Sequence, residues 1–471
     1  ERTMNRFKLM AMATLAAGAF ALAACGGANN SPAAGGNAAN APANTPADNS
    51  SAKGNGGEDK PDENPEPTEF DTAKEREAVI DEAWGYLKGM YQKDDSTMDE
   101  NAIGIPGGWG PKSMNIPYTA MVLQSVLGTK HWKPDQDIFS ESVNFLAESQ
   151  EQNGSWSYAP SNVMPEAKGQ RAVYITSIVV ELFSKLNGVD SPWKGKLDDA
   201  IAKGREYIVQ SQVGNADGPA PDYDPNKVGF GGWAYSKEEI DHAVGEKGKP
   251  ASNMSTTTYA IDALHACGVE PGDKIFKDAL TFLKRNQNAG EVQDEGFEAM
   301  YKDKKIKMAD KGDPNYGGSI YSEETSKSGV RENEDGTVTL LSYGTMTYNL
   351  LRDYLFAGLK KDDLPVKLAW RWIQRNYTVS HVPGYEDSKD YEQGLYYYYV
   401  SMAKTLNALG VDHVEEPDRG LKHDWRADLV KELQKRQKGD GSWVNSTSRW
   451  QEDSPTLCTC YALIALRNTE E

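Results

Sequence analysis

The chain has 471 residues, which is enough for one large domain or two ordinary ones. Its apolar content of 38%, with 11 Trp and 23 Tyr, can build a sizeable core. The formal net charge is −19, and no Lys/Arg cluster interrupts it in the part expected to fold. Such a chain repels phosphate backbones, so nucleic acid is excluded as a natural partner.

Residues 1–25 have the features of an export signal. Arg6 and Lys8 precede an apolar run that ends in small residues and is short for a membrane span. The end of the run, Leu22-Ala23-Ala24-Cys25, resembles the lipobox of bacterial lipoproteins, in which the Cys is lipidated and becomes the mature N-terminus. The resemblance implies an exported protein attached to a membrane through Cys25. An ordinary cleaved signal with an incidental Cys is the alternative.

Residues 26–70 are dominated by Ala, Asn, Pro, Gly, Ser and acids. Such a segment buries too little apolar surface to offset the entropy of ordering, which predicts a disordered tether. Roughly 45 flexible residues reach about 35–40 Å from end to end. Residues 71–471 are then one folded domain. Its Cys267, Cys458 and Cys460 give no disulfide framework.

From residue 70 onward a block recurs, in which an amphipathic helix, a Gly-aromatic loop and a more apolar helix follow one another. Paired Gly residues permit the positive φ of a tight turn. The loops are GGWG at 107–110, GSWSY at 154–158, GGWAYS at 231–236, GGSIYS at 317–322, PGYED at 383–387 and GSWVN at 441–445.

The helices on either side of the loops also share features. Five of the helices before the loops place an aromatic-aliphatic pair near their end, and Gln or Tyr follows in the same spacing. Five of the helices after the loops carry an equivalent Thr, namely Thr119, Thr176, Thr257, Thr347 and Thr459. Six such pairs predict an all-α fold, an (α/α)6 toroid with the apolar second helices inside. An open solenoid is the alternative, with more even repeat lengths.

The loop pattern resembles the QW repeat of squalene cyclases and related triterpene cyclases. Two copies match it fully, and these are Gln150, Gly154 and Trp156 and then Gln437, Gly441 and Trp443. The resemblance covers the folded region and implies the toroid of the terpenoid cyclase and protein prenyltransferase superfamily. We interpret the six residues as structural, because a Gln amide can bond backbone groups at a helix end while the indole packs against it.

Triterpene cyclases protonate their substrate with the motif Asp-x-Asp-Asp-Thr-Ala at the start of an inner helix. Here the corresponding stretch has Asn253, Ser255 and Thr256 in place of the acids, and only Thr257 is retained. Asn, Ser and Thr cannot protonate an alkene. The sequence therefore predicts a relative that does not cyclise.

The zinc ligands and the thioester of other toroid proteins are not matched by this sequence. Prenyltransferases bind zinc through Asp, Cys and His, but Asp453, Cys458, Cys460 and His423 have neither that spacing nor that order, so we expect buried thiols and no metal or cofactor. The Cys-Gly-Glu-Gln stretch of thioester toroids is absent from the sequence.

Exported glycoside hydrolases and lyases also use six-hairpin toroids, and glycosidases need paired carboxylates. The candidate acids are Glu181, Asp262 and Asp353 on the second helices and Asp294, Glu295 and Glu298 on the long fourth loop. No pair among them stands out in the sequence.

If the second helices face inward, their first turns gather aromatic side chains at one mouth of the barrel. Such a bowl can hold an apolar, polyprenyl-like or steroid-like ligand or stack a sugar, or its Tyr side chains can fill the barrel. The candidates are Trp109, Tyr118, Tyr174, Trp233, Tyr259, Tyr348 and Tyr397, with the two Trp at the rim.

The sequence thus predicts an exported, lipid-anchored protein that binds an apolar ligand or a protein partner without cyclising it. A divergent enzyme, either a cyclase-like isomerase or a carbohydrate-active hydrolase or lyase, is the alternative. Two carboxylates converging on the cavity would favour the enzyme, and a filled barrel would favour a scaffold.

Overall fold

The computed structural model describes residues 70–92, 107–189, 191–240 and 251–470, and Phe70–Glu471 forms one compact unit. The expected signal at 1–25 and, apart from Phe70, the expected tether at 26–70 lie outside the described residues. Lipidation of Cys25 therefore stays a prediction. Within the described residues, no helix is long and apolar enough to cross a membrane.

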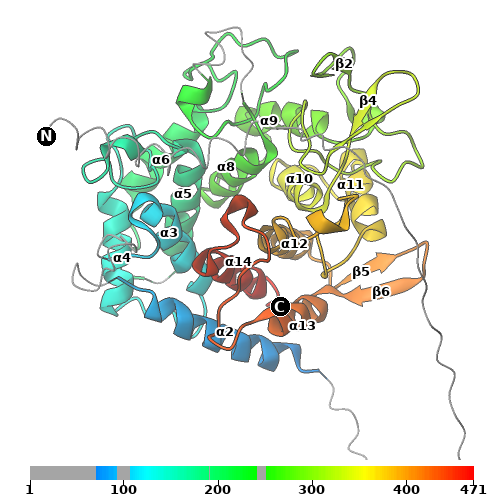
Figure 1. The fold of residues 1–471 in the computed structure, drawn as a ribbon. Helices are drawn as coiled ribbons and strands as arrows, with labels where there is room; N and C mark the ends of the chain where they lie inside the picture. The colour runs from blue at the N-terminus through cyan, green and yellow to red at the C-terminus, as the bar shows by residue number, and fades with distance from the viewer. Residues whose placement is uncertain (1–69, 93–106, 190, 241–250, 471) are drawn as a thin grey trace, which may run out of the picture. The chain divides into compact units, whose positions relative to one another are not determined.

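Helices dominate the described residues, as the sequence predicts, and they follow one another in pairs (Figure 1). The pairs are α2 (Thr72–Gly89) with α3 (Asn115–Val126), α4 (Asp137–Glu148) with α5 (Ala172–Gly188), α6 (Asp198–Gln210) with α8 (Met254–Ala266), α9 (Lys274–Arg285) with α10 (Gly344–Phe356), α11 (Leu364–Arg375) with α12 (Leu395–Leu409), and α13 (Trp425–Arg436) with α14 (Pro455–Arg467). Single 3-10 turns lie at Lys112–Met114, Pro165–Ala167, Gly290–Val292, Ser388–Asp390 and Arg449–Gln451.

The second helices of the pairs pack against one another in a closed order. Helix α3 contacts α5, and the contacts continue through α8, α10, α12 and α14 back to α3. The first helices lie around them, and α2 packs against α13 and α14 of the last pair (Figure 1). Burial follows this division, because every residue of α3 is buried whereas α6 buries only Gly204, Tyr207 and Ile208.

A repeated hydrogen-bond device ties five of the six loops to their second helix, and four of these also to their first helix. The Thr in the second helix accepts the backbone N–H of the loop residue, as between Thr176 and Trp156 at 2.9 Å. The Trp indole then donates to a carbonyl near the end of the first helix, as from Trp156 to Leu146 at 2.6 Å. Equivalent Thr bonds join Thr119 to Trp109, Thr257 to Trp233, Thr347 to Ser319 and Thr459 to Trp443.

The residue at the Gln or Tyr position links each first helix to the next first helix. Gln150 donates to the carbonyl of Ala200 in α6 at 2.9 Å, and Gln437 donates to that of Val79 in α2 at 3.0 Å. The remaining links are Tyr91 to Glu141, Gln212 to Ile275, Gln287 to Pro365 and Tyr377 to Asp428. The Gln437 bond joins the last pair to the first, so the order of first helices is also closed.

Three two-stranded antiparallel hairpins, which the sequence analysis did not predict, interrupt the helices. They pair β1 (Met300–Tyr301) with β2 (Lys304–Lys305), β3 (Val330–Glu332) with β4 (Val338–Leu340), and β5 (His413–Glu416) with β6 (Leu421–Asp424). The turn between β3 and β4 contains Asp335-Gly336, with Gly336 at φ 82°, which is a recognised hairpin signal.

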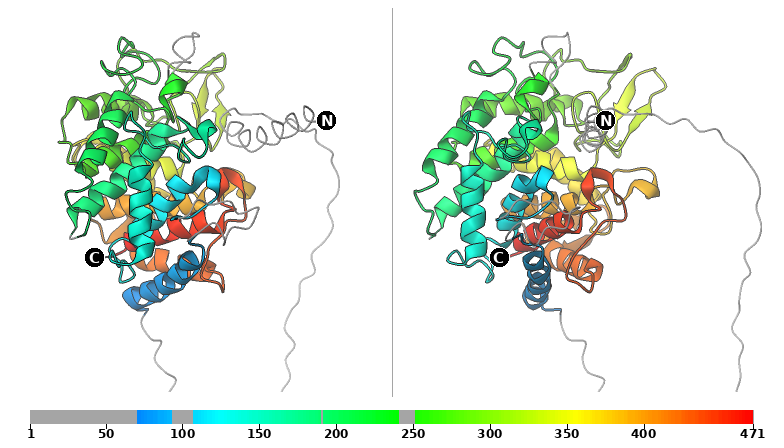
Figure 2. Two further views of the ribbon diagram at one scale, coloured as in Figure 1. Left: turned by 90° about the vertical axis from the view of Figure 1, so that its left-hand side faces the viewer. Right: turned by 60° about the vertical axis from the view of Figure 1, so that its left-hand side comes forward.

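The long connections that follow α6 and α9 lie on the same side of the helices (Figure 2). They are joined where Gly229 N–H donates to Glu323 at 2.6 Å.

Candidate functional site

Four tyrosines from the first two turns of the second helices meet inside the closed order of helices. We call Tyr174, Tyr259, Tyr397 and Tyr461 the tyrosine mouth. Tyr174 and Tyr259 meet edge to face at 4.6 Å between ring centroids, and Tyr259 and Tyr397 are stacked at 6.2 Å. Tyr461 lies 5.8 Å from Tyr397. The residues Tyr174, Tyr259 and Tyr397 are half-buried.

Polar groups border the tyrosine mouth. The Tyr235 and Tyr321 hydroxyls are 2.9 Å apart, and the Arg171 guanidinium lies 3.8 Å above the Tyr235 ring. Arg171 precedes α5 with φ 54°, in the left-handed region that costs a residue with a side chain about 1–3 kcal/mol. The strain places this cation beside the mouth.

Four of the aromatic candidates lie elsewhere. Trp109 and Trp233, expected at the rim, are fully buried, and their indoles donate to the carbonyls of Leu87 and Ile208. Both residues belong to the hydrogen-bond device of the loops, since each is the Trp of its own Gly-aromatic loop. Tyr118 and Tyr348 are also buried, and the Tyr118 hydroxyl donates to Ser454 at 3.1 Å.

The positions of the missing acids lie beside the mouth, and their polar groups are engaged. Asn253 caps α8, since its Oδ1 accepts the backbone N–H of Thr256 at 3.0 Å. Ser255 hydrogen-bonds to the Tyr397 phenol, which also accepts from Asn349 at 3.1 Å. No carboxylate replaces the acids at these three positions.

Deeper along the second helices, acids and cations from four helices converge. We call Glu181 of α5, Asp262 of α8, Arg352 of α10 and Lys404 of α12 the charged layer. Arg352 donates two hydrogen bonds to the Asp262 carboxylate, at 2.9 and 3.1 Å. Lys404 Nζ lies 2.6 Å from Asp262 and 2.9 Å from Glu181. Glu181 and Asp262 are candidate acids from the sequence, whereas the cations that pair with them were not predicted.

The protonation of these groups follows from their partners. Burial raises the pKa of Glu181, but the ammonium groups of Lys185 and Lys404 outweigh it, so the pKa falls below its usual range. Burial also lowers the pKa of Arg352, but the Asp262 carboxylate outweighs it and keeps the guanidinium charged. Glu181 is therefore held as an ion pair with Lys185 and Lys404, and Asp262 lies in ion-pair contact with Arg352 and Lys404.

Asp353, the third candidate acid of the second helices, behaves differently. Its Oδ2 accepts the Thr258 hydroxyl at 2.7 Å, while Oδ1 has no partner among the described residues. Burial raises the pKa of Asp353 to about 8. The side chain is thus a neutral carboxylic acid at neutral pH.

The remaining acid and metal candidates do not form a site in the described part of the chain. Asp294 pairs with Arg285, Glu298 pairs with Lys305, and Glu295 is exposed. The Cys458 thiol donates to the Glu452 carbonyl at 3.0 Å, and burial raises the pKa of Cys458 and Cys460. His423 lies 2.6 Å from Glu416 and so belongs to the β5–β6 hairpin. The described residues contain no group of three ligands suited to a metal ion.

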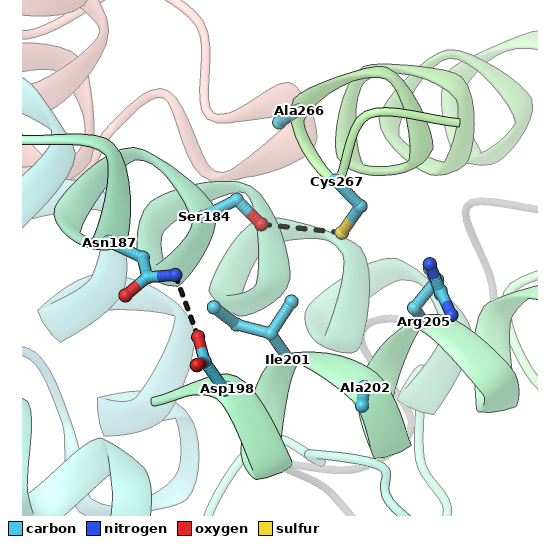
Figure 3. Close-up of a pocket in the computed structure, with 8 residues that line it drawn as sticks. All are labelled: Ser184, Asn187, Asp198, Ile201, Ala202, Arg205, Ala266 and Cys267. Atoms are coloured by element: carbon cyan, nitrogen blue, oxygen red, sulfur yellow. Dashed lines mark hydrogen bonds between the residues drawn. The ribbon is translucent and has the colours of Figure 1, made fainter. Parts of the chain in front are cut away.

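Two cavities open where the second helices end. The larger has a volume of about 390 Å³ and is bordered by the charged layer together with Lys185, His265, Phe356 and Asn407. The smaller, of about 240 Å³, lies between α5, α6 and α8 beside Cys267 (Figure 3). The Ser184 hydroxyl lies 3.3 Å from the Cys267 sulfur at its edge (Figure 3). Neither cavity could be predicted from the sequence, because their walls combine residues from separate repeats.

Comparison with known proteins gives structural likeness without sequence likeness. No protein-family model matches the chain, and no curated protein matches it. Among solved structures, the chain is similar to the apo type II terpene cyclase MstE from Scytonema, with 11% identity, 83% of this chain and 98% of that chain covered, and a TM-score of 0.46. A variant of that cyclase in complex with geranylgeranyl dihydroxybenzoate matches with 11% identity, 84% and 98% coverage and a TM-score of 0.44. At these values the likeness does not assign a family or an activity to the chain.

Proposed function

We propose that this protein is an exported, lipid-anchored (α/α)6 toroid of QW-like repeats that binds an apolar or polyprenyl-like ligand at the tyrosine mouth without cyclising it. The closed order of both helix sets and the repeated Gln and Tyr links support the toroid. The lipobox-like Leu22-Ala23-Ala24-Cys25 supports the anchor.

The state of the interior acids carries the argument against cyclisation. Alkene protonation needs a strong, unpaired carboxylic acid facing the substrate. Asp262 and Glu181 share Lys404 as an ion-pair partner, and the pKa of Asp353 is raised to about 8, which makes it a weak acid. Glu181, Asp262 and Asp353 are therefore poorly suited to supply the proton.

The tyrosine mouth supports binding of an apolar ligand. Aromatic rings offer large apolar faces at a small entropic cost, and three of these tyrosines are half-buried and not fully enclosed. The phenols add hydrogen-bonding groups that can hold one polar end of an otherwise apolar molecule. The neighbouring Arg171 suits a polar head at the same end.

The carbohydrate-active enzyme is the second candidate, because Glu181 and Asp262 do converge. A glycosidase needs one protonated and one ionised carboxyl group. Here both carboxylates contact the same ammonium group of Lys404, at 2.9 and 2.6 Å, which favours two ionised groups. The geometry therefore supports binding over hydrolysis.

The test is equilibrium binding of geranylgeraniol to the full chain in detergent, followed by mass spectrometry of the recovered ligand. Tyr259→Ala should weaken binding about tenfold, since it removes one aromatic face of the mouth. Tyr259→Phe keeps the ring and is the matched control, with affinity near that of the wild type.

Recovery of unchanged ligand from wild type and from Tyr259→Phe would support the proposal. A recovered product with a rearranged skeleton would show cyclisation and overturn it. If geranylgeraniol does not bind, but another protein binds the wild type and does not bind Tyr259→Ala, the tyrosine mouth serves a protein partner instead. Cys25→Ser should release the protein from the membrane fraction, and retention there would refute the lipid anchor.

A further inference from the structure

The larger cavity, at the opposite ends of the second helices from the tyrosine mouth, is a built polar pocket. Its volume of about 390 Å³ falls in the range of small-molecule sites, about 300–1,000 Å³. Its floor is formed by Glu181, Asp262 and Arg352, which are each at most 4% exposed. Ion pairs therefore hold the floor of the pocket in place before any ligand binds.

One atom of this floor lacks a partner. Glu181 Oε1 accepts from both Lys185 and Lys404, at 2.7 and 2.9 Å. Its other oxygen, Oε2, is buried and has no hydrogen-bond partner among the described residues. A buried carboxylate oxygen without a donor is costly, so a ligand that brings an O–H or N–H group to it gains a charge-assisted hydrogen bond.

The charges around the cavity nearly cancel. Two acids face three cations, and Lys185, the third cation, is exposed. The ion pairs leave no strong site for a full charge of either sign, since a charged ligand would have to compete with a partner already in place. A neutral ligand that both donates and accepts hydrogen bonds fits this environment best.

An aromatic wall and an amide complete the pocket. His265 of α8 and Phe356 of α10 are stacked with ring centroids 3.8 Å apart and an interplanar angle of 7°. Burial lowers the pKa of His265, which keeps the imidazole neutral near pH 7. Asn407 of α12 lines the cavity and is exposed, so its amide can exchange water for a ligand hydroxyl.

The geometry points to a second binding site in this protein, in which the cavity over the charged layer holds a neutral, polyhydroxylated ligand of sugar size. A ligand hydroxyl donates to Glu181 Oε2, other hydroxyls meet Lys185 and Asn407, and an apolar face packs on the His265–Phe356 wall. The smaller cavity shares Ser184 and Ala266 with the larger one. A second sugar unit can therefore lie beside the first, against Ser184 and Ala266.

Saturation-transfer NMR on the full chain tests this site with methyl glycosides of glucose, galactose and N-acetylglucosamine at about 10 mM, a concentration suited to millimolar affinity. Disaccharides form a second arm, which separates a free monosaccharide from the end of a glycan. His265→Ala should weaken binding about tenfold, and Asn407→Ala should also weaken it. His413→Ala removes another exposed His, on β5 and outside the cavity lining, and should leave binding unchanged.

Saturation transfer to a glycoside that falls in both His265→Ala and Asn407→Ala supports the site. The proposal is wrong if no glycoside binds at that concentration, or if both variants bind like the wild type. Displacement of the sugar by equal concentrations of acetate or methylammonium would show a charged-ligand site and would also overturn it. If Tyr259→Ala no longer binds the sugar while His265→Ala still does, the sugar lies at the tyrosine mouth, and the site over the charged layer is refuted. The proposed apolar site at the tyrosine mouth is then judged separately, by geranylgeraniol binding.

Discussion

The sharpest test of ring closure is the substitution Gly441→Ala in the last loop. Gly441 has φ 85°, and an added Cβ would lie 2.3 Å from the carbonyl oxygen of Glu82 in α2. The obstructing atoms belong to a helix backbone and cannot swing aside. The last loop is therefore packed against the first helix so closely that only glycine fits.

The cost of this substitution has two parts. A left-handed conformation costs an alanine about 1–2 kcal/mol. Forcing an extra carbon into a packed contact costs about 1–3 kcal/mol, since the loop and α2 must move apart. The free energy of unfolding should therefore fall by about 2–5 kcal/mol.

Gly439→Ala is the matched control in the same loop. Gly439 is exposed, and an added Cβ would have no atom within 4 Å. Urea unfolding followed by circular dichroism at 222 nm measures both variants, with midpoints compared at unchanged slope. If Gly441→Ala lost no more stability than Gly439→Ala, the last loop would not pack on α2 in solution, and the closed ring would be refuted.

Three further substitutions test the interior. Thr176→Val keeps the shape of the side chain but leaves the buried Trp156 N–H without its acceptor, and it should cost about 1–3 kcal/mol in urea unfolding; a cost near zero would mean that the loop device contributes no stability. Asp262→Asn leaves Lys404 and its neighbours with too little negative charge and should cost about 3–5 kcal/mol, whereas a neutral effect would show that water already screens the charged layer. Asp353 holds its proton up to about pH 8 in the folded chain but loses it near pH 4 when unfolded. Between about pH 4 and pH 8, the stability of the wild type should therefore fall relative to that of Asp353→Asn as pH rises, by up to about 1.4 kcal/mol per pH unit. Urea midpoints that stay parallel for the two proteins over this pH range would contradict the raised pKa.

Much of the helical architecture could be predicted from the sequence because the repeats share recognisable loop and helix residues. Gly-aromatic loops and the Thr of the second helices recur at positions that the fold requires, so each copy predicts the others. The three hairpins escaped this reasoning because they lie inside the connections and do not recur. The Asp335-Gly336 signal was nevertheless present in the sequence.

The site was predictable only in part. Tyr174, Tyr259 and Tyr397 do converge, because the first turns of neighbouring second helices share one end. Trp109 and Trp233 were assigned to the rim from their place in a loop, yet the loop device draws them inward. The partners of Glu181 and Asp262 could not be paired from sequence, since Arg352 and Lys404 come from other repeats. A lone cation in each of two apolar helices, Arg352 in α10 and Lys404 in α12, was the available signal of a buried acid.

The two ends of the second helices differ in the chemistry that their backbones favour. Helix N-termini carry partial positive charge, which stabilises a carboxylate and makes its acid form a better proton donor, while C-termini favour cations. A cyclase acid would open an inner helix at the first kind of end, where this chain places Asn253, Ser255 and Thr256. Asp353 instead lies in the last turns of α10, where the helix dipole and burial both oppose ionisation. Glu181 and Asp262 are therefore held as partners of Lys404 and Arg352, and Asp353 is held as a weak acid, so none of these three candidate acids lies where a cyclase acid would.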